Sequence, residues 1–326
     1  MSQALTRPAS LEAEDAATDE AAVARIISRL SAEYVLGTFQ LLIERFGDIR
    51  SGVLLMAINT ANVAHIDART EEGRDAAASD GFVLDNDRKP VGVARLAAIT
   101  GLPLGSTRRI VQRLIDVGDC ISVDGGLIVP RVVFERPESV RATTANLRRV
   151  REFVRKLLAR GLVAEAPAMI PAWQTTVARG AWVPTVARQS SAYCLRALRL
   201  VVDTYGDSQA GIVAQSIVAA NTAHLDVFMG EGWRFAGIDQ PPPDEVRRPV
   251  SVSAIARSLG VPYETLRRQV RRLIEAGVCL RVDGGLIIPT AAVERPAAAQ
   301  AMLANVRHVR EFVDILRALG FDPYDS

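Results

Sequence analysis

The sequence predicts a mainly helical protein with two small β-hairpins, in which one arrangement of elements is used twice. Apolar residues recur every three or four positions along much of the 326-residue chain, which is the spacing of amphipathic helices. An Asp-Gly pair between two apolar runs, a strong local signal for a hairpin, occurs at Asp124 and again at Asp283. The segments around these pairs, 89–130 and 248–289, align without a gap at a shift of 159 residues. The chain is therefore expected to be a tandem duplication.

The segment 248–289 predicts two short helices, a tight turn and a hairpin. Ser251 suits the N-cap of the first helix, and Gly260 suits its left-handed end. Pro262 suits the start of the second helix, and Gly277 its end. Within the second helix the inward stripe is expected to be Leu266, Val270, Leu273 and Ile274, and the hairpin strands are expected at 279–282 and 286–288. Helix, turn, helix and hairpin together make a winged helix-turn-helix.

Further helices are expected on both sides of each winged helix. A pair precedes the first one, at 23–46 and 52–68, and a pair precedes the second, at 192–205 and 210–229. An amphipathic helix trails each, at 138–160 and after Pro296. Its apolar residues step by three and four, as in a helix-pairing seam: Leu147, Val150, Val154 and Leu157, then Val306, Val309, Val313 and Leu316. The expected organisation is a disordered acidic tail (1–22), a first repeat (23–161), a linker (162–190), a second repeat (191–320) and a tail (321–326).

Positive charge is concentrated in the two predicted winged helices. The formal net charge is only +2. Eight arginines nevertheless stand against two acidic residues between Arg247 and Arg281, and six basic residues against two acidic ones between Arg88 and Ser122. A local basic excess in a near-neutral protein is the expected footprint of a nucleic-acid-binding module. General use of Arg in place of Lys does not explain why arginines gather on the outer face of one helix.

The predicted second helix, 262–276, resembles the recognition helices of bacterial winged-helix transcription regulators such as the GntR and IclR groups. The matching residues are Ala256 and Gly260 in the turn region and the run 265–273, Thr-Leu-Arg-Arg-Gln-Val-Arg-Arg-Leu. The resemblance covers only the winged helix of each copy. It implies a bacterial protein that binds double-stranded DNA and regulates transcription.

In such motifs the second helix lies in the major groove, and the residues in its N-terminal part reach base edges. Arginine can pair with guanine through two hydrogen bonds, while basic residues further along the helix more often meet phosphate. Arg113 and Arg272 are expected either on this face or beside the core with extended stems. The expected DNA-binding residues are Gly105, Ser106, Arg108, Arg109 and Gln112 in the first copy, and Tyr263, Glu264, Thr265, Arg267, Arg268, Arg271 and Arg281 in the second.

The two recognition helices share an Arg-Arg pair but differ just before it. Residues 104–106 read Leu-Gly-Ser, whereas 263–265 read Tyr-Glu-Thr. A pseudo-two-fold molecule with two non-identical half-sites is therefore expected. If the trailing helices pair within one chain, the half-sites should lie about one helical turn apart, ~34 Å, or a multiple of it. If these helices pair between chains, the protein is a homodimer with four winged helices.

A second group of polar residues also recurs. Asn62, His65 and Asp67 correspond to Asn221, His224 and Asp226. A His and an Asp two residues apart do not share a helix face, so these residues do not predict a metal site. The favoured interpretation is packing at a helix end, where Asn and Asp close hydrogen bonds. The alternative is a ligand pocket lined by Asn62, His65, Asn221 and His224.

Several classes of function are not supported by any motif. Cys120, Cys194 and Cys279 have no CxxC spacing and are expected to be buried packing residues. No signal-peptide pattern and no apolar run of ~20 residues is found, so a cytoplasmic, nucleoid-associated protein without a membrane segment is expected. No nucleophile motif or phosphate-binding loop is found, so neither an enzyme nor a cofactor is expected.

The sequence thus favours a sequence-specific, double-stranded-DNA-binding transcription regulator, for which it defines no small-molecule effector. A plasmid-type replication initiator is an alternative, because such initiators also carry two winged helices in one chain. A scaffold whose winged helices bind proteins is a further alternative, since this fold alone does not establish DNA binding.

Overall fold

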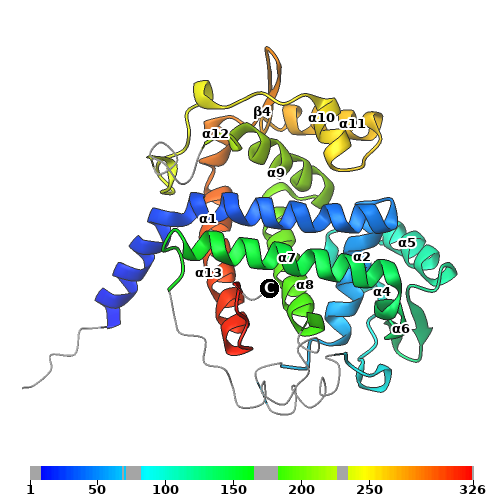
Figure 1. Ribbon diagram of the computed structural model, residues 1–326. Coiled ribbons are helices and arrows are strands. Elements are labelled where there is room, and N and C mark those ends of the chain that lie inside the picture. The colour runs from blue at the N-terminus through cyan, green and yellow to red at the C-terminus, as the bar shows by residue number, and fades with distance from the viewer. Residues whose placement is uncertain (1–8, 68–69, 71–81, 165–182, 226–233, 325–326) are drawn as a thin grey trace, which may run out of the picture.

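The protein is mainly α-helical, with two small antiparallel β-hairpins (Figure 1). The computed structural model describes residues 9–67, 70, 82–164, 183–225 and 234–324, with side chains from residue 19 onward. The N-terminal half contains α1 (Ala9–Phe46), α2 (Ile49–Asn62), the short 3-10 helix η1 (Asp85–Asp87), α4 (Val93–Thr100), α5 (Leu104–Asp116), β1 (Ile121–Val123), β2 (Gly126–Ile128), α6 (Val132–Glu135) and α7 (Pro137–Leu158). The C-terminal half contains α8 (Val183–Tyr205), α9 (Ser208–Thr222), η4 (Asp244–Val246), α10 (Val252–Ser258), α11 (Tyr263–Glu275), β3 (Leu280–Val282), β4 (Gly285–Ile287), α12 (Thr290–Val293) and α13 (Pro296–Ala318).

Four long helices form the centre of the molecule. α1 lies alongside α7, α8 lies alongside α13, and the two pairs cross one another (Figure 1). α1 also packs on α13, and α7 packs on α8, so the two halves share one core. Stacked aromatic rings fill this core: the ring centroids of Tyr34 and Phe153 are 4.7 Å apart, and those of Tyr193 and Phe312 are 5.0 Å apart.

Reciprocal hydrogen bonds cross the boundary between the halves. The hydroxyl groups of Ser31 and Tyr193 are 2.6 Å apart, and those of Tyr34 and Ser190 are also 2.6 Å apart. Asn146 Nδ2 donates to Ser190 Oγ over 2.9 Å. All of these side chains are buried, so each hydrogen bond offsets the cost of removing a polar group from water. The network therefore favours one register between the four central helices.

The same succession of elements lies on each side of this core. α4 and α5 are joined through Gly101, and α10 and α11 through Gly260, with φ of 66° and 57°. In β1–β2, Ile121 pairs with Ile128; in β3–β4, Leu280 pairs with Ile287. An isolated bridge adds a third chain segment to each hairpin, through Val91 with Leu127 and through Val250 with Leu286. Ser251 accepts a hydrogen bond from the amide of Ala254, as expected of an N-cap.

Several expected boundaries were wrong. α1 begins at Ala9, so residues 9–22 are helical and not a disordered tail; Asp19 and Glu20 form ion pairs with Arg310 and Arg307 of α13. α8 begins at Val183, inside the expected linker, whereas the Pro- and Trp-containing stretch 165–182 lies outside the described residues. α2 ends at Asn62 rather than at residue 68, because the Asn62 carbonyl accepts a hydrogen bond from the Lys89 amide. α9 ends at Thr222 rather than at residue 229, and the Asn221 carbonyl accepts a hydrogen bond from the Arg248 amide in the same way.

The trailing helices pack mainly on α1 and α8 of the same chain. Their seam residues are buried there, from Leu147 to Leu157 in α7 and from Val306 to Leu316 in α13. In this conformation the seam residues are buried within the chain and are not exposed to a second chain. Among the described residues, one helical stretch, Asp19–Phe46, is long and apolar enough to span a membrane, but half of its most apolar window is buried in the protein.

Candidate nucleic-acid interface

The expected DNA-binding residues lie on the outer faces of α5 and α11. The opposite faces are fixed by buried apolar side chains, Ile110, Val111 and Leu114 in α5 and Leu266, Val270 and Leu273 in α11. Ser106 and Thr265 are half-buried. The exposed members of the expected set are Gly105, Arg108, Arg109, Gln112, Tyr263, Glu264, Arg267, Arg268, Arg271 and Arg281.

The polar contacts on these outer faces are short-range and exposed. In α11, Arg267 Nε lies 3.0 Å from Glu264 Oε2, and Arg271 Nε lies 3.9 Å from Glu275 Oε1. In α5, Gln112 Nε2 donates to Asp116 Oδ1 over 2.9 Å. Exposed pairs of this kind contribute about 0–1 kcal/mol, so a phosphate group can replace the carboxylate at little cost.

Arg108, Arg109 and Arg268 have no ion pair within the part of the chain that the structure describes. All three are exposed. Because nothing in the fold uses their charge, these side chains are available to an external acceptor. Together with Arg267, they are the two Arg-Arg pairs that α5 and α11 share.

Arg113 and Arg272 occupy equivalent places but differ in their contacts. Arg113 Nη2 donates to Ser51 Oγ over 3.3 Å and lies 3.6 Å from Asp48 Oδ2, which ties the C-terminal part of α5 to the start of α2. Arg272 is exposed, and no ion pair is found for it among the described residues. Arg113 is therefore at least partly structural, whereas Arg272 adds to the basic surface of α11.

Each hairpin follows α5 or α11 directly in the sequence, and the turn that joins its two strands is short. In β3–β4, Val282 pairs with Gly285, so the turn is Asp283-Gly284 alone, one residue shorter than expected. Gly285 has φ of 148°, and a Cβ there would lie 2.4 Å from the Val250 carbonyl oxygen, so only glycine fits. Arg281 is exposed on β3, and its counterpart on β1 is Ser122.

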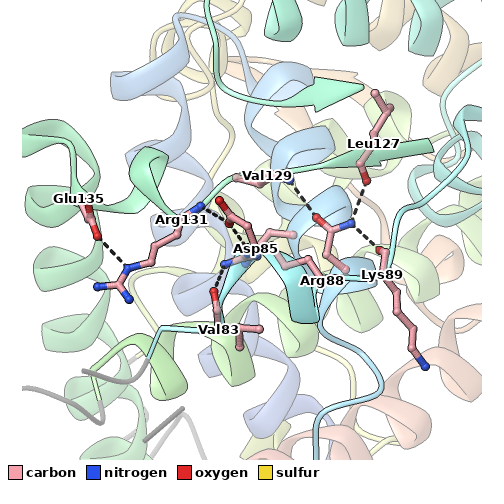
Figure 2. Close-up of polar contacts among 10 residues, drawn as sticks. Val83, Asp85, Arg88, Lys89, Leu127, Val129, Arg131 and Glu135 are labelled. Atoms are coloured by element: carbon pink, nitrogen blue, oxygen red, sulfur yellow. Dashed lines mark hydrogen bonds and ion pairs between the residues drawn. The ribbon is translucent and has the colours of Figure 1, made fainter. Parts of the chain in front are cut away.

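Two basic residues counted in the local charge excess are buried. Arg88 and Arg247 each lie 3.3 Å from an aspartate three residues earlier, Asp85 and Asp244. Arg88 Nη2 also donates to the Val83 carbonyl, and Asp85 accepts from the Arg131 amide (Figure 2). These arginines hold the segment before each α4 or α10 helix and add nothing to the outer surface. The recurring Asp-x-x-Arg spacing is the signal that identifies them.

The recurring asparagines are structural and do not line a ligand pocket. Asn62 Nδ2 donates to the carbonyls of Lys89 and Leu127 over 2.8 and 2.9 Å, and its Oδ1 accepts from the Val129 amide over 3.0 Å; the three backbone partners are labelled in Figure 2. Asn221 makes the same three contacts, with Arg248, Leu286 and Ile288. The favoured interpretation of these asparagines, hydrogen bonding at a helix end, is confirmed.

The histidines of the same group have no shared site. His65 is exposed and His224 is half-buried, and neither lines either of the two large cavities described below. Asp226 lies outside the described residues. In the described ranges no three His, Cys, Asp or Glu side chains gather closely enough to hold a metal ion. The three cysteines are buried, as expected.

The α4–α5 pair and the α10–α11 pair each rest on the first long helix of the other half, which was not expected from the sequence. A Cβ on Gly101 would lie 2.8 Å from Val202 of α8, and a Cβ on Gly260 would lie 2.4 Å from Ile43 of α1. Arg199 Nη1 donates to the Ala98 carbonyl over 3.1 Å, and Gln40 Nε2 donates to Ser258 Oγ over 3.3 Å. These contacts fix both helix pairs to the shared core.

Comparisons of the chain with protein-family models, with curated proteins and with solved structures gave no match.

Proposed function

We propose that this protein is a sequence-specific, double-stranded-DNA-binding transcription regulator, formed by tandem duplication of a winged helix-turn-helix unit. Two helices joined by a left-handed glycine, followed by a hairpin with a bridged third segment, occur in both halves. Residues 159 positions apart make the same contacts, as Asn62 and Asn221 do. These features support the duplication and the choice of fold. The α5 and α11 helices would be the recognition helices.

The observation that carries the proposal is the exposed arginine surface of α5 and α11. The fold buries one face of each helix and leaves its arginines outside, in exposed pairs or, for Arg108, Arg109, Arg268 and Arg272, without an ion pair in the described chain. Basic helix faces bind the phosphate backbone, and their arginines pair with guanine edges in the major groove. A cytoplasmic, nucleoid-associated location follows from this function.

The shared core gives the two recognition helices a fixed mutual placement. Each helix-turn-helix is held by α1 or α8 of the other half through the contacts of Gly101 and Gly260. A single chain would therefore read two half-sites at a set spacing, without the need for a second copy.

The first test measures how salt affects binding of the purified chain to a mixed-sequence DNA duplex. Each phosphate contact contributes about −0.9 to the slope of log Kobs against log salt. A steep negative slope is expected. A flat response, or no binding at low salt, would contradict the proposal and favour a protein-binding scaffold.

The second test removes the central pair of α11 with Arg267→Ala and Arg268→Ala together. Loss of about 1–3 kcal/mol per base contact is expected in the affinity for a selected site. Arg141→Ala is a matched control, since it removes an exposed arginine of α7 that lies in neither α5 nor α11. Equal footprints for wild type and the double variant would remove the recognition-helix assignment.

A further inference from the structure

Two cavities lie at the boundary between the halves, and they are equivalent in position. The Arg188 cavity, about 140 Å³, lies between α1, α2, α7 and the start of α8; the Arg29 cavity, about 150 Å³, lies between α8, α9, α13 and α1. Many of their lining residues correspond at a shift of 159, among them Asn146 with Asn305 and Arg88 with Arg247. The Arg188 cavity is lined mainly by the N-terminal half, with one wall from α8 of the C-terminal half. The Arg29 cavity is lined mainly by the C-terminal half, with one wall from α1 of the N-terminal half.

The Arg188 cavity combines apolar walls with three cationic groups. Leu42, Leu55 and Phe134 are among its apolar lining residues. The cationic groups are Arg45, Arg88 and Arg188. Arg45 Nη2 lies 3.2 Å from Asp119 Oδ1, so its charge is compensated. Arg88 is hydrogen-bonded to Asn59 Oδ1 and lies 3.3 Å from Asp85, so its charge is compensated.

Arg188 lacks such compensation. Its Nη2 donates to Thr185 Oγ1 over 3.0 Å, but its Nε and Nη1 atoms are buried without a hydrogen-bond partner in the described structure. No carboxylate of the described residues lies within ion-pair distance of it. Burial, and then the positive charge of Arg88, lower the pKa of Arg188 to about 10, so the group is still cationic at neutral pH. A guanidinium with two buried nitrogens and no anionic partner is costly, and an anion within the cavity would offset that cost.

The size of the cavity limits the ligand. An apolar cavity of about 150 Å³ admits a molecule the size of benzene. Nucleotides and phosphorylated sugars are too large and too polar for these walls. We propose that the Arg188 cavity binds a small amphipathic carboxylate, with a ring-sized apolar body against its walls and the carboxylate on Arg188.

The Arg29 cavity has related chemistry, with Arg29, Arg25 and Arg247 among its lining residues. Arg29 also makes interactions elsewhere in the chain. The proposal therefore rests on the Arg188 cavity alone.

The position of α8 gives the site a regulatory consequence, which rests on the proposed DNA binding. Arg188 lies near the start of α8. Further along the same helix, Arg199 donates to the Ala98 carbonyl in α4, and Val202 lies beside Gly101 in the turn between α4 and α5. A carboxylate at Arg188 would change the support of the first recognition helix, and would therefore change DNA affinity.

Calorimetry on the full chain without DNA tests the site directly. The probes are benzoate and cyclohexanecarboxylate, with benzamide as the neutral match and inorganic phosphate as the small anion. Saturable carboxylate binding, at least about 10-fold tighter than benzamide, is expected, because charge-assisted hydrogen bonds are the stronger ones. Equal affinity for benzoate and benzamide, or binding of phosphate alone, would overturn the proposal.

Substitutions separate ligand binding from folding. Arg188→Gln should weaken benzoate binding at least about 10-fold, Arg188→Lys should retain part of it, and the exposed Arg141→Gln should leave it unchanged. Without ligand, Arg188→Gln should raise the melting temperature, because it removes an unpaired buried charge. A lower melting temperature with unchanged benzoate affinity would assign Arg188 a structural role and overturn the site.

The regulatory consequence has its own readout. Saturating benzoate should shift the affinity of the wild-type chain for duplex DNA and leave that of Arg188→Gln unchanged. An unchanged wild-type affinity would remove the effector role while leaving the calorimetric result intact. Failure to bind DNA at all would instead contradict the proposed function.

Discussion

The N-terminal and C-terminal halves agree closely inside and differ outside. The buried amides of Asn62 and Asn221 make the same three backbone contacts, and Asp48 and Asp207 cap α2 and α9 in the same way. On the outer face, by contrast, the first turn of α5 is Leu-Gly-Ser and that of α11 is Tyr-Glu-Thr. The interior is therefore set by packing requirements that both halves share, whereas the outer faces are free to differ.

The two outer faces also differ in charge, and the face of α11 and β3 carries more arginines than the face of α5 and β1. Gln112 in α5 corresponds to Arg271 in α11, and Ser122 in β1 corresponds to Arg281 in β3. Arg113 is held by α2, whereas Arg272 is exposed. The C-terminal half thus presents more free positive charge. If the helices read DNA, it should supply the larger share of phosphate binding.

The largest effects are expected from the buried asparagines. Asn62→Ala removes the side-chain partner of the Val129 amide and of the Lys89 carbonyl, and one of the two hydrogen bonds to the Leu127 carbonyl, which keeps that from the Val91 amide. Each unsatisfied buried group costs about 1–3 kcal/mol. Urea unfolding should show a loss of about 3–5 kcal/mol for Asn62→Ala, and the same loss for Asn221→Ala. The exposed Thr144→Ala in α7 should change stability by about 0.5 kcal/mol or less. A clear inequality between the two asparagine variants would break the equivalence of the halves.

The next largest losses of stability are expected from valine substitutions at the left-handed glycines of the two turns. Gly260→Val places a β-branched residue at φ of 57° with its Cβ 2.4 Å from Ile43, and Gly101→Val meets Val202 in the same way. Strain and overpacking together should cost about 2–4 kcal/mol in thermal unfolding of either variant. Gly105→Ala, where a Cβ meets nothing within 4 Å, should not lower stability. An unaltered melting curve for Gly260→Val would place the turn elsewhere.

A smaller effect is expected when the first turns are exchanged. If α5 and α11 are recognition helices, as proposed, replacing Leu104, Gly105 and Ser106 by Tyr, Glu and Thr should transfer the half-site preference of α11 to α5, since residues at these positions would reach base edges. Competition between selected duplexes should show a change in preference worth about 1–3 kcal/mol. An unchanged preference would mean that the shared arginines alone set specificity. The reverse exchange in α11 serves as the matched control.

The smallest effect is expected from ionisation of the three buried cysteine thiols at high pH. Burial raises the pKa of Cys120 and Cys279 to about 11 and that of Cys194 to about 12. At pH 8 all three should react with a thiol reagent only on unfolding. Because the folded state holds these protons more tightly, stability is full below the unfolded pKa near 9 and falls as pH rises through about 11. Rapid reaction of one thiol in the native protein would show that its half opens locally.

The elements of the fold were largely predictable from the sequence, because they depend on local signals. Gly260, Ser251 and the Asp-Gly turns act within a few residues, so the helices and hairpins of 89–130 and 248–289 were expected correctly. The expected start of the first helix, residue 23, was wrong. An acidic composition alone does not reveal that Asp19 and Glu20 pair with arginines of the distant α13.

The outer faces of α5 and α11 were also predictable, since the apolar stripe of each helix defines its opposite face. The way in which the helices of the two halves cross was not predictable from the sequence. Contacts such as Ser31 with Tyr193, and Gly101 with Val202, join residues more than a hundred positions apart, and no periodicity encodes them. The Arg188 cavity depends on the same crossing. The sequence therefore showed no sign of this cavity, and its only indication of a ligand pocket was the recurring group that includes Asn62 and His65.

The central claim is that the arginines of α5 and α11 read two half-sites of one duplex. Sequencing of duplexes selected by the purified chain from a randomised library tests it most directly. We expect a bipartite motif with two different halves at a fixed spacing; Arg108→Ala with Arg109→Ala should erase one half, and Arg267→Ala with Arg268→Ala the other. No enriched motif, or the same motif from all three proteins, would contradict the account.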